Sequence, residues 1–387
     1  MNLLNDILSF TVFVLGIIYI RQIFVFVSGI KKLKKGTIGF FPTIAVIVPA
    51  RNEEEHIGNC VKALLHQDYP KEKVTIIVVD DQSSDNTAEV VQKLSEGSSR
   101  VRLLKIENHP HHVSPKINAL MLGIAQTTSE IIFTTDADCV VGAQWLSSIT
   151  KHFSPEVGIV TGTTIFYNKQ QVAPLLFGVQ FLDFLSQTAC AAGAIGNGEV
   201  NNCNGSNMAF RRSAYDAVGG YSSLAHINSG DDSLLAQQIV STTQWKIRFA
   251  IEPESQVTTF PVEHWKDFLQ QRMRWAVQTA HYQPAMLMFL VTSFLLYILL
   301  FVLTPFSIVF FTEFPLPVIV LCGKFIIDYL ILKRFTTLTK TSSILKFFFP
   351  AEIFHIPTVL LAVFGGYFGH FEWKGRTLVR AMEKARA

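Results

Sequence analysis

Two short apolar runs decide the fold of this chain: TIAVIV at residues 43–48 and VTIIVV at residues 74–79. Both runs are rich in β-branched residues and both end in polar residues, which is typical of strands buried on both faces. Between them, residues 53–67 carry apolar side chains at helical spacing. The three segments together predict a strand, a helix and a second strand parallel to the first.

This pattern continues along the chain. Residues 131–135 form a third apolar run, and residues 101–106 and 158–163 are weaker strand candidates. Apolar strands that alternate with helices predict an α/β fold with a mostly parallel sheet covered on both faces. Ligands of such sheets bind beyond the carboxyl ends of the strands. Two acidic signals, Asp80-Asp81 and Asp136-Ala-Asp138, follow predicted strand ends.

Both ends of the chain are unusually apolar. Of the 387 residues, 49% are hydrophobic and only 16% are charged, which departs from the globular norm in the direction of membrane proteins. Because about 20 apolar residues cross the hydrocarbon core, we expect a transmembrane anchor at residues 1–30. A C-terminal membrane region at residues 285–387 is expected to hold two spans, at 286–311 and 316–332. Residues 347–368 either cross as a third span or re-enter.

Basic residues give the expected orientation. Four lysines lie between residues 31 and 35, in a basic linker of residues 31–42, and lysines directly after a span belong on the cytoplasmic side. The first apolar run follows Asp6 instead of a basic segment and has no small-residue cleavage site behind it, which favours an uncleaved anchor over a signal peptide. We therefore expect the N-terminus outside and a cytoplasmic domain over residues 43–260.

Composition argues against several other classes of protein. The net charge of +3 and the lack of a basic stripe interleaved with aromatic residues disfavour a nucleic-acid partner. The five cysteines are widely spaced and form no Cys-x-x-Cys pair, which indicates neither a disulfide framework nor a zinc site. No Gly-x-Gly-x-x-Gly follows the first strand, so a dinucleotide-dependent oxidoreductase is disfavoured.

Asp136 and Asp138 are candidate metal ligands. Two carboxylates separated by one residue at a strand end project to the same side, and oxygen ligands suit Mg²⁺ or Mn²⁺. A diphosphate would complete the coordination, and the metal would neutralise its charge as it departs. The alternative is an aspartate pair that caps a helix starting near Gln144.

Asp80 and Asp81 are candidate nucleoside ligands, because a carboxylate there could accept the imide N–H of uracil or bond a ribose hydroxyl. Asp85 fits the simpler role of a cap for a helix over residues 87–94. The segment after the first strand would form the other wall of the nucleotide pocket. Its candidate residues are Pro49, Ala50, Arg51 and Glu53.

Two further segments suit phosphate and sugar recognition. Lys116 opens a predicted helix, where the helix N-terminus would help it to contact a phosphate, although a surface lysine fits equally. Residues 203–210, CNGSNMAF, combine a flexible turn with hydroxyl and amide groups. Gly205 and Ser206 are therefore candidates for contacts with a sugar or an acceptor, and a plain β-turn is the alternative.

Asp231 and Asp232 begin a predicted helix over residues 233–240. Helix capping explains one aspartate. Catalysis is the other explanation, because a carboxylate near the anomeric carbon of a sugar donor could take the proton of an attacking hydroxyl. Direct displacement with one such base inverts the anomeric centre.

A predicted interfacial segment spans residues 261–284. Gln271, Arg274 and Trp275 lie at positions i, i+3 and i+4 of its helix and therefore share one face. The amide and the guanidinium could hold a pyrophosphate, and the indole could stack on an acceptor. Arg272, by contrast, fits an ordinary contact with lipid headgroups.

Taken in order, these motifs resemble the membrane-bound family 2 glycosyltransferases, which carry a strand-end aspartate, a D-x-D, an acidic pair and Q-x-x-R-W. The resemblance covers about residues 43–282 and extends weakly to residues 373–376. It implies the GT-A nucleotide-diphospho-sugar fold, Mg²⁺ or Mn²⁺ as cofactor, and inversion. It also implies roles for individual residues: Asp80 and Asp81 bind the nucleoside, Asp136 and Asp138 serve the metal with Asp136 also at the nucleotide, Asp232 is the base, and Gln271, Arg274 and Trp275 hold pyrophosphate and acceptor.

One departure from this family concerns Asp231, a candidate for contacts with the pyrophosphate or acceptor, because relatives usually have Glu-Asp where this chain has Asp231-Asp232. The single N-terminal anchor, the Pro-Lys-Ile-Asn segment and the few C-terminal spans look most like ceramide glucosyltransferases. We therefore expect an inverting enzyme that moves a sugar from a nucleotide-diphospho-sugar, a UDP-sugar, to a hydroxyl of a membrane lipid. The alternative is a processive polysaccharide synthase that extends and exports a β-linked polymer.

Overall fold

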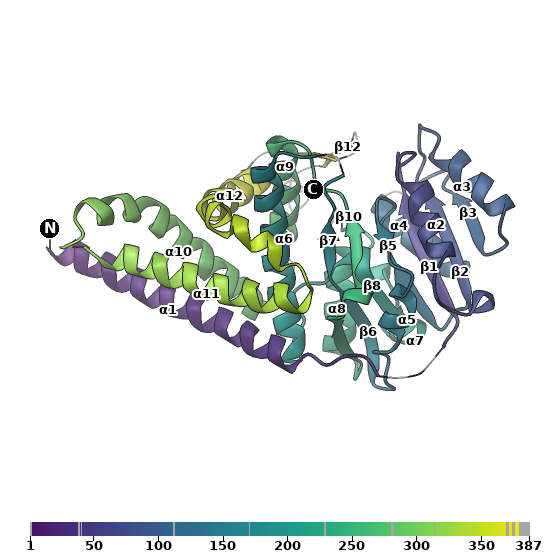
Figure 1. Cartoon of the computed structure of the whole chain (residues 1–387), viewed down its shortest axis with the longest axis horizontal. Coiled ribbons are helices and arrows are strands. Elements are labelled where there is room, and N and C mark those ends of the chain that lie inside the picture. Colours follow the sequence, from purple (N-terminus) through teal and green to yellow (C-terminus); the bar gives the residue numbers. More distant parts are fainter. Residues whose placement is uncertain are drawn as a thin grey trace. The chain divides into compact units, whose positions relative to one another are not determined.

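A computed structural model describes residues 2–37, 39, 41–110, 113–169, 171–227, 230–279, 282–312, 314–368, 371–373 and 376–378. The chain divides into two compact units, and Figure 1 labels most of their elements. The helical unit comprises Met1–Lys32, Gln170–Asn197 and Val262–Ala387. The sheet unit comprises Leu33–Lys169 and Gly198–Pro261.

The sheet unit is built on a seven-stranded sheet in the order β3-β2-β1-β4-β8-β6-β9. The strands are β1 (Ile44–Ala50), β2 (Val74–Asp80), β3 (Val101–Lys105), β4 (Ile131–Thr134), β6 (Val157–Gly162), β8 (Met208–Arg211) and β9 (Lys246–Ala250). The pairs β1 with β2, β1 with β4, β2 with β3, and β6 with β9 are parallel, whereas β8 runs antiparallel to its neighbours β4 and β6. The predicted α/β fold with a mostly parallel sheet is confirmed.

Helices and apolar strands form the core of the sheet unit. Its helices are α2 (Ile57–Leu65), α3 (Thr87–Glu96), α4 (Pro115–Ala125), α5 (Trp145–Thr150), α7 (Arg212–Ala217) and α8 (Asp231–Thr242). In α2 the buried side chains are Ile57, Cys60, Val61 and Leu64, which recur at helical spacing and join the core with β1 and β2. Each fully buried aliphatic side chain stabilises the fold by roughly 1.5–3 kcal/mol.

The carboxyl ends of the central strands meet at one edge of the sheet. Ala50 at the end of β1 is in register with Asp80 at the end of β2, and the Asp81 backbone N–H donates to the Ala50 carbonyl at 2.8 Å. On the other side of β1, Ile47 is in register with Thr134 at the end of β4. The residues that follow β1, β2 and β4 are thereby brought to the same edge.

A small second sheet lies in the same unit. It consists of β5 (Val140–Val141), β10 (Val257–Thr259) and β7 (Thr164–Phe166). β10 pairs antiparallel with β5 and parallel with β7. Because β5 closely follows the D-x-D segment, this sheet brings hydroxyl side chains of β7 and β10 to the acidic residues.

The helical unit contains α1 (Asn2–Lys32), α6 (Pro174–Gly196), α9 (Trp265–Gln278), α10 (Pro284–Val309), α11 (Leu316–Leu338) and α12 (Phe348–Phe368), with a short pair of strands, β11 (Phe371–Trp373) and β12 (Arg376–Leu378). Glycines let α1 and α6 approach closely. A Cβ atom on Gly29 would lie 1.8 Å from the Gly193 carbonyl oxygen. Lys32 then donates to the Asn197 side chain at 2.8 Å, and Asn197 donates to the Val25 carbonyl at 3.0 Å.

Four helical segments in the described part of the chain are long and apolar enough to cross a membrane: Leu3–Lys32, Pro174–Gly196, Pro284–Val309 and Ser342–Phe368. The membrane character predicted for both ends of the sequence is therefore supported. α6 was not expected as an apolar helix, because the sequence placed it inside the 43–260 domain. α11 was expected as a span but is not one of the four, since charged residues such as Lys324 and Asp328 interrupt it.

Candidate active site

The segment after β1 is tied to the segment after β2. Ser84 donates its backbone N–H to the Asn52 side chain at 2.9 Å, and Asn52 donates its own N–H to the Ser83 hydroxyl at 3.0 Å. Arg51 donates to the Asp81 carbonyl at 2.6 Å, and the Glu53 N–H donates to the Thr87 hydroxyl at 2.7 Å. The structure thus places the predicted wall, Pro49 to Glu53, directly beside the strand-end aspartates.

Asp80 and Asp81 are buried at the end of β2. The Asp80 Oδ1 atom is buried and has no hydrogen-bond partner among the described residues. A buried carboxylate oxygen in this state calls for a donor from elsewhere, since leaving it unsatisfied is costly. Asp85 does act locally as predicted, because its carboxylate accepts from the Thr87 N–H at 3.0 Å in the first turn of α3.

His109 is a residue of this region that sequence reasoning missed. Its Nε2 atom lies 2.5 Å from Asp81 Oδ1, and the Asn118 amide nitrogen lies 3.4 Å from its Nδ1 atom. The imidazole of His109 thus lies between the Asp81 carboxylate and the Asn118 amide. His109 lies in the loop after β3, where spacing offers no signal for a pairing with Asp81.

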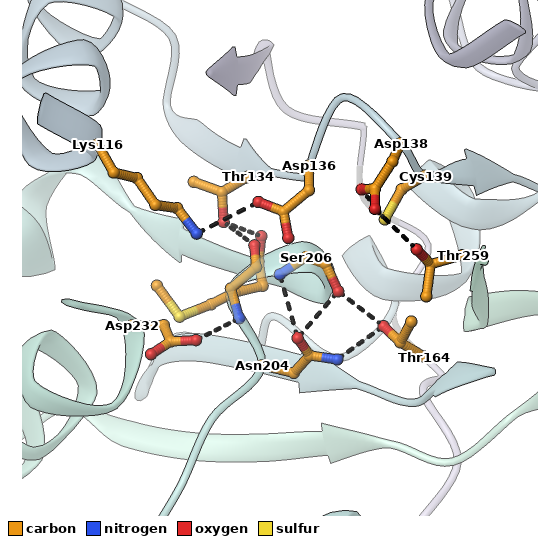
Figure 2. A network of polar contacts seen from close by, with 12 residues as sticks. Lys116, Thr134, Asp136, Asp138, Cys139, Thr164, Asn204, Ser206, Asp232 and Thr259 are labelled. Carbon is orange, nitrogen blue, oxygen red and sulfur yellow. Dashed lines mark hydrogen bonds and ion pairs between the residues drawn. The ribbon is translucent and has the colours of Figure 1, made fainter. Parts of the chain in front are cut away.

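Asp136 and Asp138 stand together just beyond β4 (Figure 2). Their carboxylates and the Cys139 thiol have ligand atoms within 4.8 Å of one another. Burial raises the pKa of the Cys139 thiol, so the thiol is neutral, and it donates to Asp138 Oδ1 at 3.6 Å. Two carboxylates with a protonated thiol suit a hard divalent cation held by oxygen. The alternative role as a helix cap is not met, because α5 begins after Gln144 without a side-chain cap bond.

Lys116 is the cation that faces the D-x-D pair. Its ammonium lies 3.2 Å from Asp136 Oδ1, and Figure 2 shows it reaching from α4 toward that carboxylate. Burial opposes its charge, but Asp136, Asp231 and Asp232 together raise the pKa of Lys116 above its ordinary value. The predicted helix-opening lysine is therefore paired with Asp136, although 31% of its side chain remains exposed.

Gly205 links Asp232 by hydrogen bonds to β4, the strand that precedes the D-x-D motif. The Gly205 N–H donates to Asp232 Oδ2 at 2.5 Å, while the Gly205 carbonyl accepts from Thr134 of β4 at 2.8 Å. The Ser233 N–H donates to Asp232 Oδ1 at 2.7 Å. Gly205 thus supports the site through its backbone, and a side chain at this position would meet the Asp232 carboxylate.

The electrostatic setting of Asp232 suits a proton acceptor. Burial, helped by the neighbouring Asp231, raises the pKa of Asp232 to about 6, while Lys116 and the two N–H donors oppose the rise. Asp231 is itself buried in the first turn of α8. A carboxylate with a pKa near 6 is mostly ionised at neutral pH and still basic enough to take a proton.

Ser206 belongs to a hydroxyl and amide cluster that the sequence only partly foresaw. Asn204 accepts from the Ser206 hydroxyl at 2.9 Å and donates to the Thr164 hydroxyl at 2.7 Å, and Thr164 lies 2.9 Å from Ser206 (Figure 2). Thr259 donates to Asp138 Oδ2 at 3.2 Å from β10. Asn204 belongs to the predicted segment 203–210, whereas Thr164 was not a candidate, because only the three-dimensional position of β7 brings it here.

Gln271, Arg274 and Trp275 lie on α9 in the helical unit. Arg272, predicted to contact lipid headgroups, is instead 4% exposed and forms an ion pair with Asp183 of α6. That prediction is wrong because the guanidinium finds a carboxylate on the neighbouring helix. The weaker tail motif, residues 373–376, includes Lys374 and Gly375, which lie outside the described residues.

Comparison with known proteins decides the family. The sequence model of glycosyl transferase family 21 matches residues 8–385, nearly the whole chain. The chain belongs to this family. The prediction from the motifs that the chain is a glycosyltransferase with a GT-A fold is thereby confirmed. The matching family model is that of family 21.

Individual relatives of this family 21 chain are distant. It is 27% identical over 246 residues to the beta-monoglucosyldiacylglycerol synthase of Synechocystis, covering 61% of this chain and 47% of that protein. It is 28% identical over 241 residues to the poly-beta-1,6-N-acetyl-D-glucosamine synthase of Staphylococcus aureus, covering 60% and 53%. The chain thus spans about half the length of these curated relatives.

Among solved structures, the chain is similar to a mannosyltransferase of Pyrobaculum calidifontis in complex with GDP-mannose and Mn²⁺. The TM-score is 0.60, the sequence identity is 19%, and the match covers 93% of this chain and 99% of the other. A likeness at this identity supports the GT-A fold, with nearly the whole chain included.

Proposed function

We propose that the chain is an inverting glycosyltransferase that moves one sugar from a UDP-sugar to a hydroxyl of a membrane lipid. The observation that carries this proposal is the set of acidic groups around Lys116 in the sheet unit. Asp136 lies 3.2 Å from the ammonium, and Asp231 and Asp232 act on the same charge. A chain of two hydrogen bonds through Gly205 links Thr134 of β4 to Asp232.

The reaction is a single displacement at the anomeric carbon. Asp232 takes the proton of the acceptor hydroxyl as its oxygen attacks, and the bond between the anomeric carbon and the phosphate oxygen breaks. The nucleoside diphosphate departs with the bonding electrons, and attack from the opposite face inverts the centre. The pKa of Asp232 near 6 supports this role, because the carboxylate is ionised at neutral pH.

The remaining residues of the site hold the donor. Asp80, whose buried Oδ1 has no hydrogen-bond partner in the part of the chain that the structure describes, offers an acceptor for the uracil imide or a ribose hydroxyl. Lys116 supplies positive charge beside the D-x-D pair. Mg²⁺ or Mn²⁺ on Asp136 and Asp138 would neutralise the charge of the leaving diphosphate. The Mn²⁺ and GDP-mannose named for the Pyrobaculum enzyme support a divalent cation and a nucleotide sugar.

A lipid acceptor at the cytoplasmic face fits the apolar helices and the relatives. Leu3–Lys32 is long enough to anchor the chain, and the lysines after it favour a cytoplasmic sheet unit with the N-terminus outside. The name of the Synechocystis relative supports an acceptor that is a membrane lipid. Gln271, Arg274 and Trp275 of α9 are then assigned to pyrophosphate and acceptor, as in the Q-x-x-R-W motif.

Asp232→Asn tests the proposal, because it removes proton acceptance while changing little volume. Purified full-length protein in lipid nanodiscs is incubated with a panel of labelled UDP- and GDP-sugars, and lipid products are identified by mass spectrometry. Transfer is expected to fall about 10²–10⁴-fold with UDP binding retained. Turnover at the wild-type rate in Asp232→Asn would remove the assigned base, and the absence of any glycosylated lipid from wild type would remove the function.

The alternative is a processive synthase, favoured by the likeness to the Staphylococcus aureus poly-beta-1,6-N-acetyl-D-glucosamine synthase. The same incubation separates the two. A single-sugar lipid supports one transfer per acceptor, whereas a ladder of lengthening polymer supports the synthase.

A further inference from the structure

We propose that Arg272 and Asp183 are positioning residues for Gln271 and Trp275, two of the three Q-x-x-R-W residues. This inference rests on the proposed function, because it assumes that Gln271 and Trp275 meet the donor pyrophosphate or the acceptor. Arg272 lies between the motif residues Gln271 and Arg274, and no sequence pattern indicated that it is buried. All the contacts involved lie within the helical unit.

Arg272 is anchored at its Nε side by α6. The guanidinium Nε atom forms the ion pair with Asp183 Oδ2, and Nη2 lies 3.4 Å from the Gln180 carbonyl. Asp183 is held in turn by Gln187, which donates to the same oxygen at 3.1 Å. Because a buried ion pair that loses one partner is strongly destabilised, Asp183 holds the Arg272 guanidinium in one orientation.

The other edge of the guanidinium fixes the amide of Gln271. Arg272 Nη1 donates to Gln271 Oε1 at 2.5 Å. Because the oxygen end of the carboxamide is engaged, the NH₂ end is turned away from Arg272. Gln271 is thereby set to present N–H donors, which is the orientation needed to bind an anionic pyrophosphate.

The flat faces of the guanidinium order the aromatic residues of α9. The Arg272 Cζ atom lies 4.2 Å from the centroid of the Trp275 ring and 4.5 Å from that of Phe268. Both distances are well inside the range of cation–π contact. The indole that is assigned to the acceptor is therefore stacked on a cation whose own position is set by Asp183. A lysine ammonium is not planar, so it cannot stack on the Trp275 ring and also donate to both Asp183 and Gln271.

Arg272→Lys is the test, with Lys266→Met as a matched control that alters an exposed cation on the same helix. Full-length protein in nanodiscs is assayed for kcat and KM of transfer, for UDP binding and for thermal unfolding. Arg272→Lys is expected to lower kcat/KM about 10- to 100-fold, as for a lost hydrogen bond to a charged group. The unfolding midpoint should stay near wild type, UDP binding should weaken because the Gln271 amide is no longer held toward the pyrophosphate, and Lys266→Met should leave both transfer and UDP binding unchanged.

A double-mutant cycle separates positioning from a general structural role. If Arg272 acts through its neighbours, Arg272→Lys should cost less than about threefold when Gln271→Ala and Trp275→Phe are already present, because coupled sites are not additive. Gln271→Glu should keep the contact with Arg272 yet weaken transfer, since it replaces the donor end by a negative charge.

The outcomes are distinguishable from those of the proposed function. Independent, multiplicative losses in the cycle, or wild-type transfer in Arg272→Lys, would overturn the positioning role while Asp232→Asn still abolishes transfer. Retained transfer in both Asp232→Asn and Gln271→Ala would remove the proposed function and this inference together.

Discussion

The protonation of Asp232 gives the activity its expected pH dependence. Burial and then Asp231 raise the pKa of Asp232 to about 6, and only the ionised carboxylate can accept the hydroxyl proton. Transfer should therefore rise with pH up to about 6, falling about tenfold per unit below it, and level off above.

A neighbouring substitution checks the sign of this effect. Asp231→Asn removes a like charge, so the pKa of Asp232 should fall and the acidic limb of the kcat profile should move to lower pH. The measurement is kcat against pH for wild type and Asp231→Asn with saturating donor. A limb that stays in place, or moves to higher pH, would contradict the assignment of the limb to Asp232.

Asp138 should control metal-dependent donor binding. Asp138→Asn keeps the shape of the side chain and removes the charge that a divalent cation needs. We expect the Mn²⁺ concentration that supports half-maximal UDP binding to rise at least about tenfold, which is the scale of one lost charged interaction. The measurement is a Mn²⁺ titration by calorimetry. Asp216→Asn, a carboxylate outside the site on α7, is the control and should leave the titration unchanged.

At the scale of helices, a buried charge cluster joins four elements of the helical unit. The Lys324 ammonium lies 2.7 Å from Asp328, 2.6 Å from Glu352 and 3.1 Å from His355 Nδ1, and the Tyr19 hydroxyl donates to Asp328 at 2.8 Å. The ammonium thus occupies the centre of a group of ligand-type side chains that could otherwise hold a metal ion. Tyr297 of α10 lies against this ammonium, with its ring centroid 5.5 Å away.

Lys324→Met should destabilise the helical unit, because Asp328 and Glu352 would face each other without a cation. Removal of one partner of a buried pair costs about 3–5 kcal/mol. Thermal unfolding in detergent measures the effect, with Lys333→Met, an exposed lysine on the same helix, as the control. Equal unfolding midpoints for the two variants would show that the cluster adds nothing to stability.

The elements differ in how far the sequence could predict them. The strands β1, β2 and β4 were found because buried parallel strands leave uninterrupted β-branched runs, and the structure places the predicted aspartates at or just beyond the ends of β2 and β4. β8 carries a short run without such a pattern, and its antiparallel pairing depends on contacts that are distant in sequence.

Side chains whose role depends on a distant partner were beyond sequence reasoning. His109 contacts Asp81, and Arg272 contacts Asp183. The spacing of these residues along the sequence predicts neither contact. The apolar helix α6 was also missed. A helix that is hydrophobic all round is read either as a buried core element or as a membrane span, and composition does not separate the two.

At the scale of the whole molecule, the connectivity of α6 constrains the topology. Both ends of this helix lead into the sheet unit, at Lys169 before it and Gly198 after it. A single helix that crossed the bilayer would place these ends on opposite sides. A sheet unit that lies in the cytoplasm therefore requires that α6 does not cross, although its length and composition would allow it. Its burial against α1 fits a helix sheltered by other helices.

We therefore expect Lys169 and Glu199, both exposed and on either side of α6, to face the cytoplasm, and the N-terminus to face outside. Cysteines placed at these two positions, with Cys322 replaced by serine, should react with a membrane-impermeant maleimide only after permeabilisation of the cells. An N-terminal epitope tag should be detected on intact cells. Labelling of Lys169→Cys and Glu199→Cys under opposite conditions would show that α6 crosses, and an N-terminal tag hidden until permeabilisation would reverse the predicted orientation of α1.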